Sequence, residues 1–419
     1  MADIQLFHGD ILFTAEAESF SVFENCYIAV RNGTVSGIYR QLPEQYSGLQ
    51  VTDYGRGLII PAFSDLHIHA PQFMMRGTDM DLLLYDWLNS CTFPEEARFS
   101  DVEYANTVYN ALADEMISNG TFHACVFSSI HTDSTLRLCS ILAARGIHAL
   151  VGKVNMDINS PDYLCETVKE SLSETERFLS SLDRNSIVKP ILTPRFAPTC
   201  SEELLYGLGK LGKKYACGMQ THLVESKWEA SEAVRLFPDC SSDAQIYEKA
   251  GLLDNGPSVF AHFIFPTEED IKITQKYKAF TVHCPDATNN IIAGIMPASK
   301  VIKDDIEVAL GTDVGAGSKM SVYSQIAKTV QLSKLRGFYE GEESTISFSR
   351  AFYMATKAGG KLFGNYGSFE NGYVFDALVV DNLEDCGIKL TPEKRLERFC
   401  YNGDNRNIIA GYIAGKKVI

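Results

Sequence analysis

Two histidines one residue apart close an apolar segment near the start of the chain, at positions 61–69. Alternate residues of a strand point to the same face, so His67 and His69 could bind one metal ion from a single strand end. A lone His-x-His pair is more often structural than metal-binding. The pair becomes informative because an Asp and further histidines follow other short apolar segments.

Three later segments end in residues that can bind a metal or carry a proton: His222, His262 and Asp313. Three neutral imidazoles and one carboxylate, with water in the remaining position, suit hydrolytic chemistry by Zn²⁺ or Fe²⁺. Such a site needs a proton carrier that is not a ligand, and Glu225, three residues after His222, is the candidate. Asp313 could orient the water, and His262 could stabilise charge on the adduct.

Two of these assignments have plain structural alternatives. Glu225 could be an ordinary carboxylate near a helix N-terminus. His283, in a similar position after another apolar segment, could be a core histidine as easily as a substrate contact.

Eight short apolar segments are candidate strands, and longer segments with helical periodicity separate them. The segments are 58–69, 122–128, 149–156, 188–194, 217–222, 258–262, 280–284 and 308–313. This alternation is typical of βα units around a parallel sheet, and eight strands predict an α/β fold of the (β/α)8 TIM-barrel type. Helices are expected at 102–117, with Ser100 as N-cap, and at 201–214.

The candidate site residues fall at the C-terminal ends of these predicted strands. A (β/α)8 barrel builds its active site at that end. His67, His69, Arg195, His222, His262, His283 and Asp313 are therefore expected at one end of the barrel, where the site is built.

Both ends of the chain differ from the central part, because they consist of short β segments and turns. Asn32-Gly33 between two apolar runs predicts a hairpin, and similar runs occupy 374–381 and 408–419. We expect one small β-sandwich domain built from residues 1–57 and 366–419, around a hydrolase barrel at 58–365.

Composition narrows the class of protein. The 419 residues include 38 basic and 53 acidic side chains, a net charge of −15, which argues against a nucleic-acid surface. The first residues do not resemble a signal peptide and no apolar run approaches a membrane span, so we expect a cytoplasmic protein with no membrane partner. The 11 scattered cysteines are expected to be reduced.

Longer motifs resemble a known family. His67-Ile-His69-Ala-Pro-Gln72, the 81–88 segment and Phe93-Pro-Glu-Glu96-Ala-Arg-Phe resemble the amidohydrolase superfamily, in particular its nucleobase deaminase branch and the guanine deaminases within it. The resemblance continues through 152–157, 193–196, 222–226, 283–285 and 311–314 and covers essentially the whole chain. The Ala-Pro-Gln and Phe-Pro-x-Glu-x-Arg-Phe runs are the most specific parts.

The resemblance implies a function and a set of roles. One Zn²⁺ per subunit, or Fe²⁺ in its place, would be bound by His67, His69, His222 and Asp313, and catalysis would use Glu225, His262 and Asp313. A purine would be held by Gln72, Arg195 and the backbone at Phe196, next to His69, His222, Glu225 and Asp313. The implied reaction converts guanine and water to xanthine and ammonia, in a homodimer. Arg195 offers a fork of donors to a ring carbonyl, and Gln72 can donate and accept along a purine edge.

Other readings remain open. Residues 286–290 depart from the family's usual Ser/Asn-rich stretch, so the ring could be 8-oxoguanine, a pterin or cytosine. A metal-dependent amide or chloride hydrolase would use similar ligands but has no evident use for Gln72 and Arg195. A scaffold without catalysis is disfavoured because every candidate ligand and Glu225 are present. Segment 71–100 is expected to form a wall or lid of the site.

Overall fold

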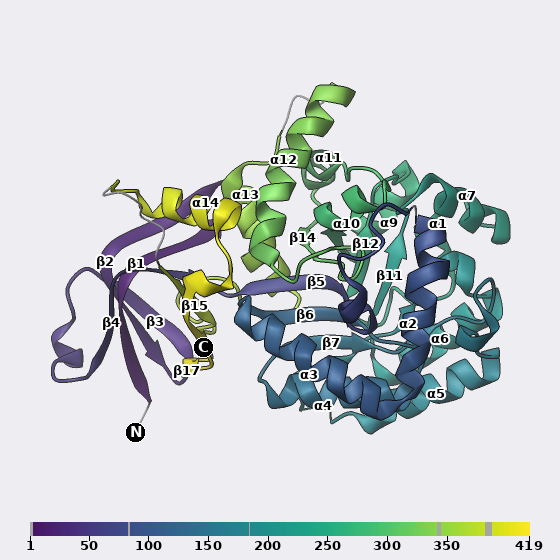
Figure 1. Ribbon diagram of the computed structural model, residues 1–419, viewed down its shortest axis with the longest axis horizontal. Coiled ribbons are helices and arrows are strands. Elements are labelled where there is room, and N and C mark those ends of the chain that lie inside the picture. The colour runs from purple at the N-terminus through teal and green to yellow at the C-terminus, as the bar shows by residue number, and fades with distance from the viewer. Residues whose placement is uncertain (1–2, 83, 184, 342–344, 382–387) are drawn as a thin grey trace.

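The computed structural model describes residues 3–82, 84–183, 185–341, 345–381 and 388–419. It has an α/β fold in which parallel strands alternate with helices, and a sheet made from both ends of the chain lies beside them (Figure 1). The α/β prediction is confirmed.

Each of the eight apolar segments forms strand structure, and these strands are almost entirely buried, as expected of a parallel sheet covered by helices. They are β5 (Phe63–His69), β6 (Thr121–Phe127), β7 (His148–Gly152), β8 (Val154–Asn155), β9 (Val188–Pro190), β10 (Thr193–Pro194), β11 (Met219–Leu223), β12 (Ser258–His262), β13 (Phe280–His283) and β14 (Val308–Leu310). The predicted segments 149–156 and 188–194 are each divided into two short strands. The predicted strand at 58–69 needs correction, since residues 58–61 end β4 (Val51–Pro61) of the sheet formed by the chain ends and only β5 is a central strand.

The central strands form two parallel four-stranded sheets, β5-β6-β7-β9 and β11-β12-β13-β14, with a short β10-β8 pair. Backbone hydrogen bonds join the two sheets at both edges. Gln220 donates its N–H to the carbonyl of Leu192 at 2.8 Å. At the other edge, Asp313 donates its N–H to the carbonyl of His67 at 2.8 Å.

The helices surround these strands, and the last of them packs on the sheet formed by the chain ends (Figure 1). They are α1 (Leu84–Trp87), α2 (Phe93–Ala97), α3 (Val102–Ser118), α4 (Thr132–Ala144), α5 (Val168–Ser181), α6 (Glu202–Tyr215), α7 (Lys227–Leu236), α8 (Asp243–Lys249), α9 (Glu268–Tyr277), α10 (Pro285–Asn290), α11 (Ala298–Lys303), α12 (Val322–Glu340), α13 (Phe348–Tyr353) and α14 (Pro392–Asn402). The predicted helices at 102–117 and 201–214 correspond to α3 and α6. The predicted N-cap of α3 is wrong, because the Asp101 side chain accepts the N–H groups of Glu103 and Tyr104, while Ser100 belongs to the preceding 3-10 turn.

The chain ends form one seven-stranded sheet, in the order β17-β16-β15-β4-β1-β2-β3. Its strands are β1 (Ile4–Glu16), β2 (Ser19–Arg31), β3 (Thr34–Tyr39), β4 (Val51–Pro61), β15 (Ala377–Val380), β16 (Ile408–Ile413) and β17 (Lys416–Lys417). The sandwich prediction needs correction, since a single sheet curls over its own core instead of two sheets stacking. Phe7 on β1 and Tyr412 on β16, three strands apart in the order, have ring centroids 4.8 Å apart.

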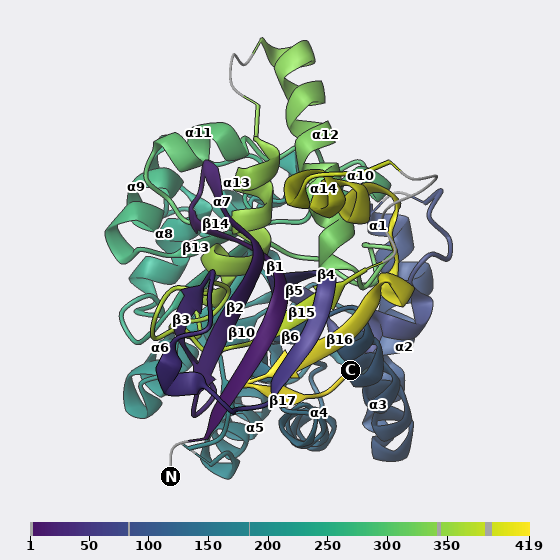
Figure 2. The same cartoon turned by 90° about the vertical axis from the view of Figure 1, so that its left-hand side faces the viewer.

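The terminal sheet packs on the side of the central strands, as the turned view shows (Figure 2). Leu58, Leu378 and Ile413 from this sheet belong to the same apolar cluster as the central strands. A buried polar contact accompanies them: His123 of β6 lies 2.8 Å from Asp376 through Nε2 and 3.1 Å from Ser64 Oγ through Nδ1. The two parts of the molecule are thus joined by apolar packing and by a buried His–Asp pair.

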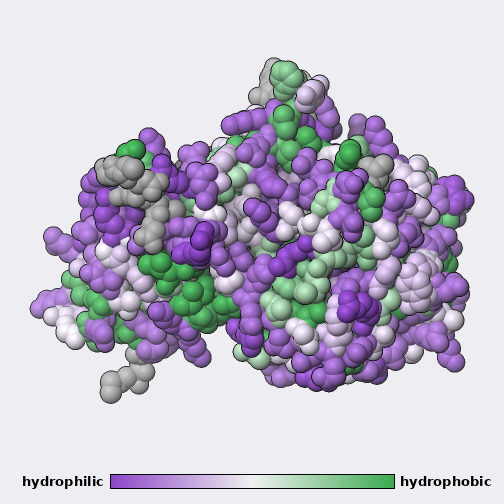
Figure 3. All heavy atoms as spheres, viewed as in Figure 1, coloured by the Kyte–Doolittle hydropathy of each residue, from purple (hydrophilic) through white to green (hydrophobic). Residues whose placement is uncertain are grey.

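The face drawn in Figure 3 is mainly hydrophilic, with hydrophobic residues gathered over the terminal sheet and its junction with the central part, and a smaller group along the projecting α12. Near the end of this helix Phe338 is 80% exposed and Tyr339 is 77% exposed.

Across the described part of the chain, no helix is both long and apolar enough to cross a membrane. The cysteines in the described residues are free thiols.

Candidate active site

The predicted site residues lie at the carboxyl ends of different central strands. His69 is the last residue of β5, His262 is the last residue of β12, and His222 is the fourth of five residues in β11. Arg195 directly follows β10, and Asp313 follows β14 by three residues. Parallel strands bring these ends to one side of the fold, so residues far apart in the chain become neighbours.

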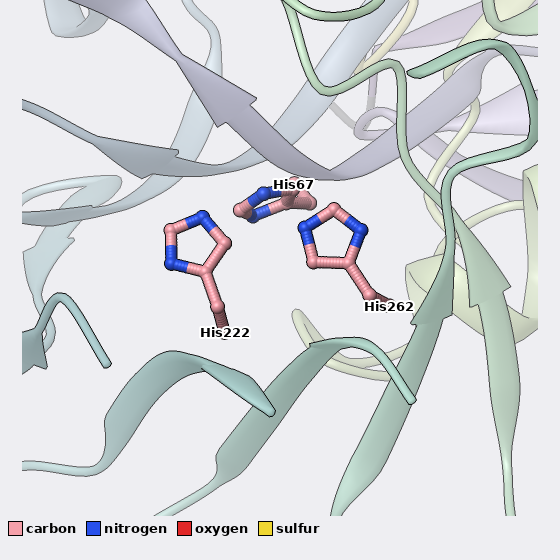
Figure 4. Close-up of side chains that lie close together, drawn as sticks. All are labelled: His67, His222 and His262. Carbon is pink, nitrogen blue, oxygen red and sulfur yellow. The ribbon is translucent and has the colours of Figure 1, made fainter. Parts of the chain in front are cut away.

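Four histidines and Asp313 form a compact buried cluster. The Nε2 atoms of His69 and His222 are 3.0 Å apart, and Asp313 Oδ1 lies 3.2 Å from His67 Nε2 and 3.4 Å from His69 Nε2. His67, His222 and His262 bring one ring nitrogen each within 4.8 Å of the others, and His67, His69 and Asp313 do the same with their ligand atoms. Figure 4 shows the His222 and His262 rings on either side of His67. The geometry adds His262 to the residues able to bind a metal.

The protonation of this cluster suits a metal ion. Burial lowers the pKa of His67 to about 3, and it lowers those of His69, His222 and His262 well below the usual value, so the imidazoles are neutral. His222 Nδ1 lies 2.7 Å from the carbonyl of Arg195, which fixes Nε2 as the nitrogen with the free lone pair. His67 Nε2 is buried without a hydrogen-bond partner. Neutral imidazoles, a carboxylate and an unsatisfied buried nitrogen fit a divalent metal site.

Three strand ends in this region have a left-handed backbone. The φ angles are 48° at Val224, 74° at His262 and 49° at Asp313. Such conformations are uncommon outside glycine and cost of order 1–3 kcal/mol each, and they cluster at functional sites. Here they turn the chain sharply at the point where a site side chain must face inward.

Glu225 lines the cavity beside the histidine cluster. Its Oε1 is 3.6 Å from His262 Nε2, and His262 Nε2 is 3.9 Å from Asp313 Oδ2. Burial first, and then the charge of Asp313, raises the pKa of Glu225 to about 8. A carboxyl group with this pKa can both give and take a proton near neutral pH.

A second polar unit at the cavity is centred on Glu96. One Glu96 oxygen accepts from Gln72 Nε2 at 2.8 Å, and the other accepts from an Arg195 guanidinium nitrogen at 2.6 Å. The Gln72 carbonyl accepts the N–H of Gly315 at 3.2 Å. Both ends of the Gln72 amide are therefore fixed, as is the plane of the Arg195 fork.

Residues of both polar units line one cavity. Its lining includes all predicted site residues except His67, which lies deeper: His69, Gln72, Arg195, Phe196, His222, Glu225, His262 and Asp313. Leu84, Trp87 and Leu88 from segment 71–100 also line it, so this segment forms a wall, although residue 83 is outside the described residues. Apolar and aromatic groups thus face a polar centre, an arrangement suited to a flat heterocycle.

Three contributors to the site had no assigned role in the sequence. Glu96 stands inside the Phe-Pro-x-Glu-x-Arg-Phe run, which was its only signal. Trp228 and Glu229 line the cavity from α7. In the sequence, Glu229 follows Ser226 by three residues, a spacing that is typical of the start of a helix.

His283 does not line this cavity. It lines a separate cavity with Met296 and Arg336, and burial lowers its pKa to about 4.

Comparison with known proteins places these features in a family. Residues 58–418 match the family model described as "Amidohydrolase family". A guanine deaminase of Dictyostelium discoideum is 32% identical over 445 aligned positions, which span 99% of this chain and 98% of that protein. A guanine deaminase of Rattus norvegicus is 37% identical over 86% of this chain and 82% of its own length.

Solved structures agree with these sequence relationships. The crystal structure of a guanine deaminase from C. acetobutylicum, with guanine bound in its active site, has a TM-score of 0.97 and 41% identity. The match covers 100% of both chains.

Proposed function

This chain belongs to the amidohydrolase family and groups with its guanine deaminases, and on this premise we propose that it converts guanine and water to xanthine and ammonia. The observation that carries the proposal is the cavity itself. One wall can bind a metal and move protons, and the other offers fixed donors and an acceptor to the edge of a flat ring.

We propose Zn²⁺ as the resident metal, with Fe²⁺ as the alternative, held by His67, His69, His222 and Asp313. Neutral imidazoles and the unpartnered Nε2 of His67 support this assignment. When bound, the metal would lower the pKa of a water molecule so that it can act as a nucleophile near neutral pH.

The purine would be held by the wall opposite the metal ligands. Arg195 presents a planar fork that can donate to the ring carbonyl, and Gln72 can donate and accept along the neighbouring edge. The Phe196 backbone would add a contact, and the Phe196 and Trp87 rings offer flat apolar walls. This binding would place C2, which carries the exocyclic amine, toward the histidine cluster.

Glu225 would carry the protons of the reaction. It would protonate N3 as water adds to C2, and then deliver the water's other proton to the departing amine, so that ammonia leaves and xanthine remains. Asp313 would accept a hydrogen bond that orients the water, and His262 would stabilise the charge that develops on the added oxygen.

We also propose that the eight central strand positions close into a (β/α)8 barrel, supported by the hydrogen bonds that join the two sheets at both edges. The boundaries at 1–57, 58–365 and 366–419 stay predictions, as do a homodimer and a cytoplasmic location.

The first experiment is ammonia release from guanine, 8-oxoguanine, isoxanthopterin, cytosine and adenine by zinc-loaded protein, with metal content measured in parallel. Guanine should be turned over best. A preference for a pterin or an oxidised purine would keep the reaction class and change the ring. Metal-replete protein that releases no ammonia from any of the five would refute the deaminase assignment.

Glu225→Gln should keep zinc and bind guanine, yet lose turnover by about 10²- to 10⁴-fold, because the amide cannot carry the proton. Guanine binding is measured by calorimetry, and zinc by elemental analysis. Near-normal turnover in the zinc-loaded variant would remove Glu225 from the mechanism.

A further inference from the structure

The strand that carries His222 ends in a strained turn before it reaches Glu225. Val224, the residue between β11 and Glu225, has a φ of 48°, which is a marked outlier for a β-branched side chain. This turn directs Glu225 into the cavity. The surrounding structure must hold the turn in place, since an unsupported Val would leave the left-handed region.

Two buried carboxyl groups hold this turn by its backbone. Asp243 Oδ2 accepts the N–H of Val224 at 3.3 Å, and Glu229 Oε2 accepts the N–H of Glu225 at 2.9 Å. Asp243 is the first residue of α8, and Glu229 lies in the first turn of α7, where its own N–H donates to Ser226 Oγ at 3.0 Å. Both side chains are 2% exposed.

The same two carboxyl groups accept from consecutive backbone N–H groups, so they lie side by side at this turn. Glu229 Oε1 and Asp243 Oδ1 are buried and have no donor as partner. A buried acceptor without a donor destabilises the folded protein, and one proton between these two oxygens would satisfy both.

The surroundings oppose two separate negative charges at this place. The charge of Glu225 acts on Glu229, and the charges of Glu229 and Asp270 act on Asp243. Burial raises the pKa of Glu229 to about 8 and raises that of Asp243 well above its usual value. Close, buried carboxyl pairs of this kind retain a proton.

We propose that Glu229 and Asp243 share one proton and that this acid pair is a positioning device for Glu225, fixing the turn that aims its side chain at the substrate. Neither residue takes part in the chemistry. The inference rests on the proposed function, because the role of Glu225 as proton carrier belongs to it.

The shared proton predicts an unusual pattern for amide substitutions. In Glu229→Gln the new carbonyl can accept the Glu225 N–H while the NH₂ donates to ionised Asp243, so one amide replaces the shared proton at the same net charge. Asp243→Asn can do the same in the opposite direction. In the double variant two NH₂ groups would face each other, and one backbone N–H or one amide must lose its partner.

The test compares kcat and KM for guanine in the zinc-loaded wild type, both single amide variants, the double amide variant and Glu229→Ala. Both single amide variants should keep a higher kcat than the double variant and Glu229→Ala, which should lose about 10- to 100-fold in kcat relative to the wild type, with metal content unchanged. Glu232→Ala is the matched control, because it removes a half-buried carboxyl of the same helix that pairs with Arg235. Single amides as impaired as the double variant, or a fully active double variant, would overturn the proposal.

A second measurement does not depend on activity. The infrared spectrum in D₂O should contain a band of a protonated carboxyl group that is absent from both single amide variants, and the thermal midpoint should fall in the double variant but not in the single ones. If the wild type does not deaminate guanine but this pattern holds, the acid pair stands and the proposed function fails. If guanine is turned over but the band is missing from the wild type, the shared proton is wrong.

Discussion

Glu96 accepts hydrogen bonds from Gln72 and Arg195, the two side chains expected to recognise the purine edge. An ionised carboxylate has only acceptor oxygens, so it can serve two donors at once. Because Glu96 accepts from the Gln72 NH₂, the Gln72 carbonyl is turned toward Gly315 and accepts its N–H. One buried anion thus sets the donor and acceptor pattern that a ring would meet.

Replacing Glu96 with Gln should separate recognition from chemistry. The amide can accept from Arg195 or from Gln72 but must turn its NH₂ toward the other donor, so both side chains shift. Because misplacement by about 1 Å can cost about 10²-fold, we expect kcat/KM for guanine to fall by about that factor, mainly through KM, with zinc retained. Steady-state kinetics and metal analysis check this expectation.

The neighbouring residue supplies the control for that substitution. Glu95 of the same helix pairs with Arg98 at 2.9 Å and accepts from the Tyr104 hydroxyl, so Glu95→Gln should leave KM unchanged. Equal KM values in Glu96→Gln and the wild type would mean that Gln72 and Arg195 are held by other contacts.

The sequence predicted the metal ligands better than it predicted the residues that orient the substrate. His67, His222 and Asp313 follow apolar runs, a pattern that can be recognised without knowing which residues are in contact. Glu96 reaches Arg195 from 99 positions earlier in the chain, and only the folded structure shows that the two side chains meet. The pairing of Glu229 with Asp243 depends in the same way on how α7 and α8 pack.

At the scale of single elements, the apolar segments predicted strand positions well but not their interruptions. Pro190 and Pro194 have no N–H to donate, which explains why a continuous ladder does not run through 188–194. The break after Gly152 accommodates Lys153, a buried lysine whose ammonium lies 2.6 Å from Glu166. A single buried ion pair of this kind leaves no periodic signal in a sequence.

The start of α3 offers a direct test at this scale. Asp101 accepts the N–H groups of Glu103 and Tyr104, at 2.9 and 3.3 Å, while Ser100 donates to the carbonyl of Ala97. Asp101→Ala should lower the free energy of unfolding by about 1 kcal/mol, the usual cost of a lost N-cap, and Ser100→Ala should lower it by much less. Urea denaturation of both variants measures the difference, and the reverse order would restore Ser100 as the cap.

At the scale of the whole molecule, the contact between the terminal sheet and the central strands includes titratable groups. His148 at the start of β7 lies near His123, and its Nδ1 is 3.3 Å from the Tyr366 hydroxyl. Burial, reinforced by the charge of His123, lowers the pKa of His148 to about 4. In the unfolded chain the pKa of a histidine is about 6.5.

This difference predicts how stability depends on pH. Between about pH 6.5 and pH 4 the unfolded chain binds a proton at His148 that the folded chain does not, so stability is full above that window and is lost as the pH falls through it. His148→Asn should therefore lose less stability than the wild type between about pH 7 and pH 4.5 in urea denaturation. The metal ligands titrate in both proteins, so the difference isolates His148. Parallel losses in the two proteins would assign the acid sensitivity to other groups.

The layout of the whole molecule could be predicted more fully than its terminal domain. Apolar runs at both ends predicted that the termini share β structure, and β4 does pair with β15. The sequence contained no signal for the curl that brings Phe7 against Tyr412, because such a contact depends on bulges and twist along long strands.

The pairing of β4 with β15 has a consequence for synthesis of the chain on the ribosome. Pro61 and Ala377 are partners in the sheet but lie roughly 300 residues apart in the chain. Because the ribosome adds about 5–20 residues per second, β15 is synthesised about 15–60 s after β4, and the edge of β4 stays unpaired for that time. During that time an apolar strand edge is open to other nascent chains. A chaperone that shields residues 51–61 would therefore raise the yield of native protein. Premature termination before residue 377 would leave a product that is prone to aggregation.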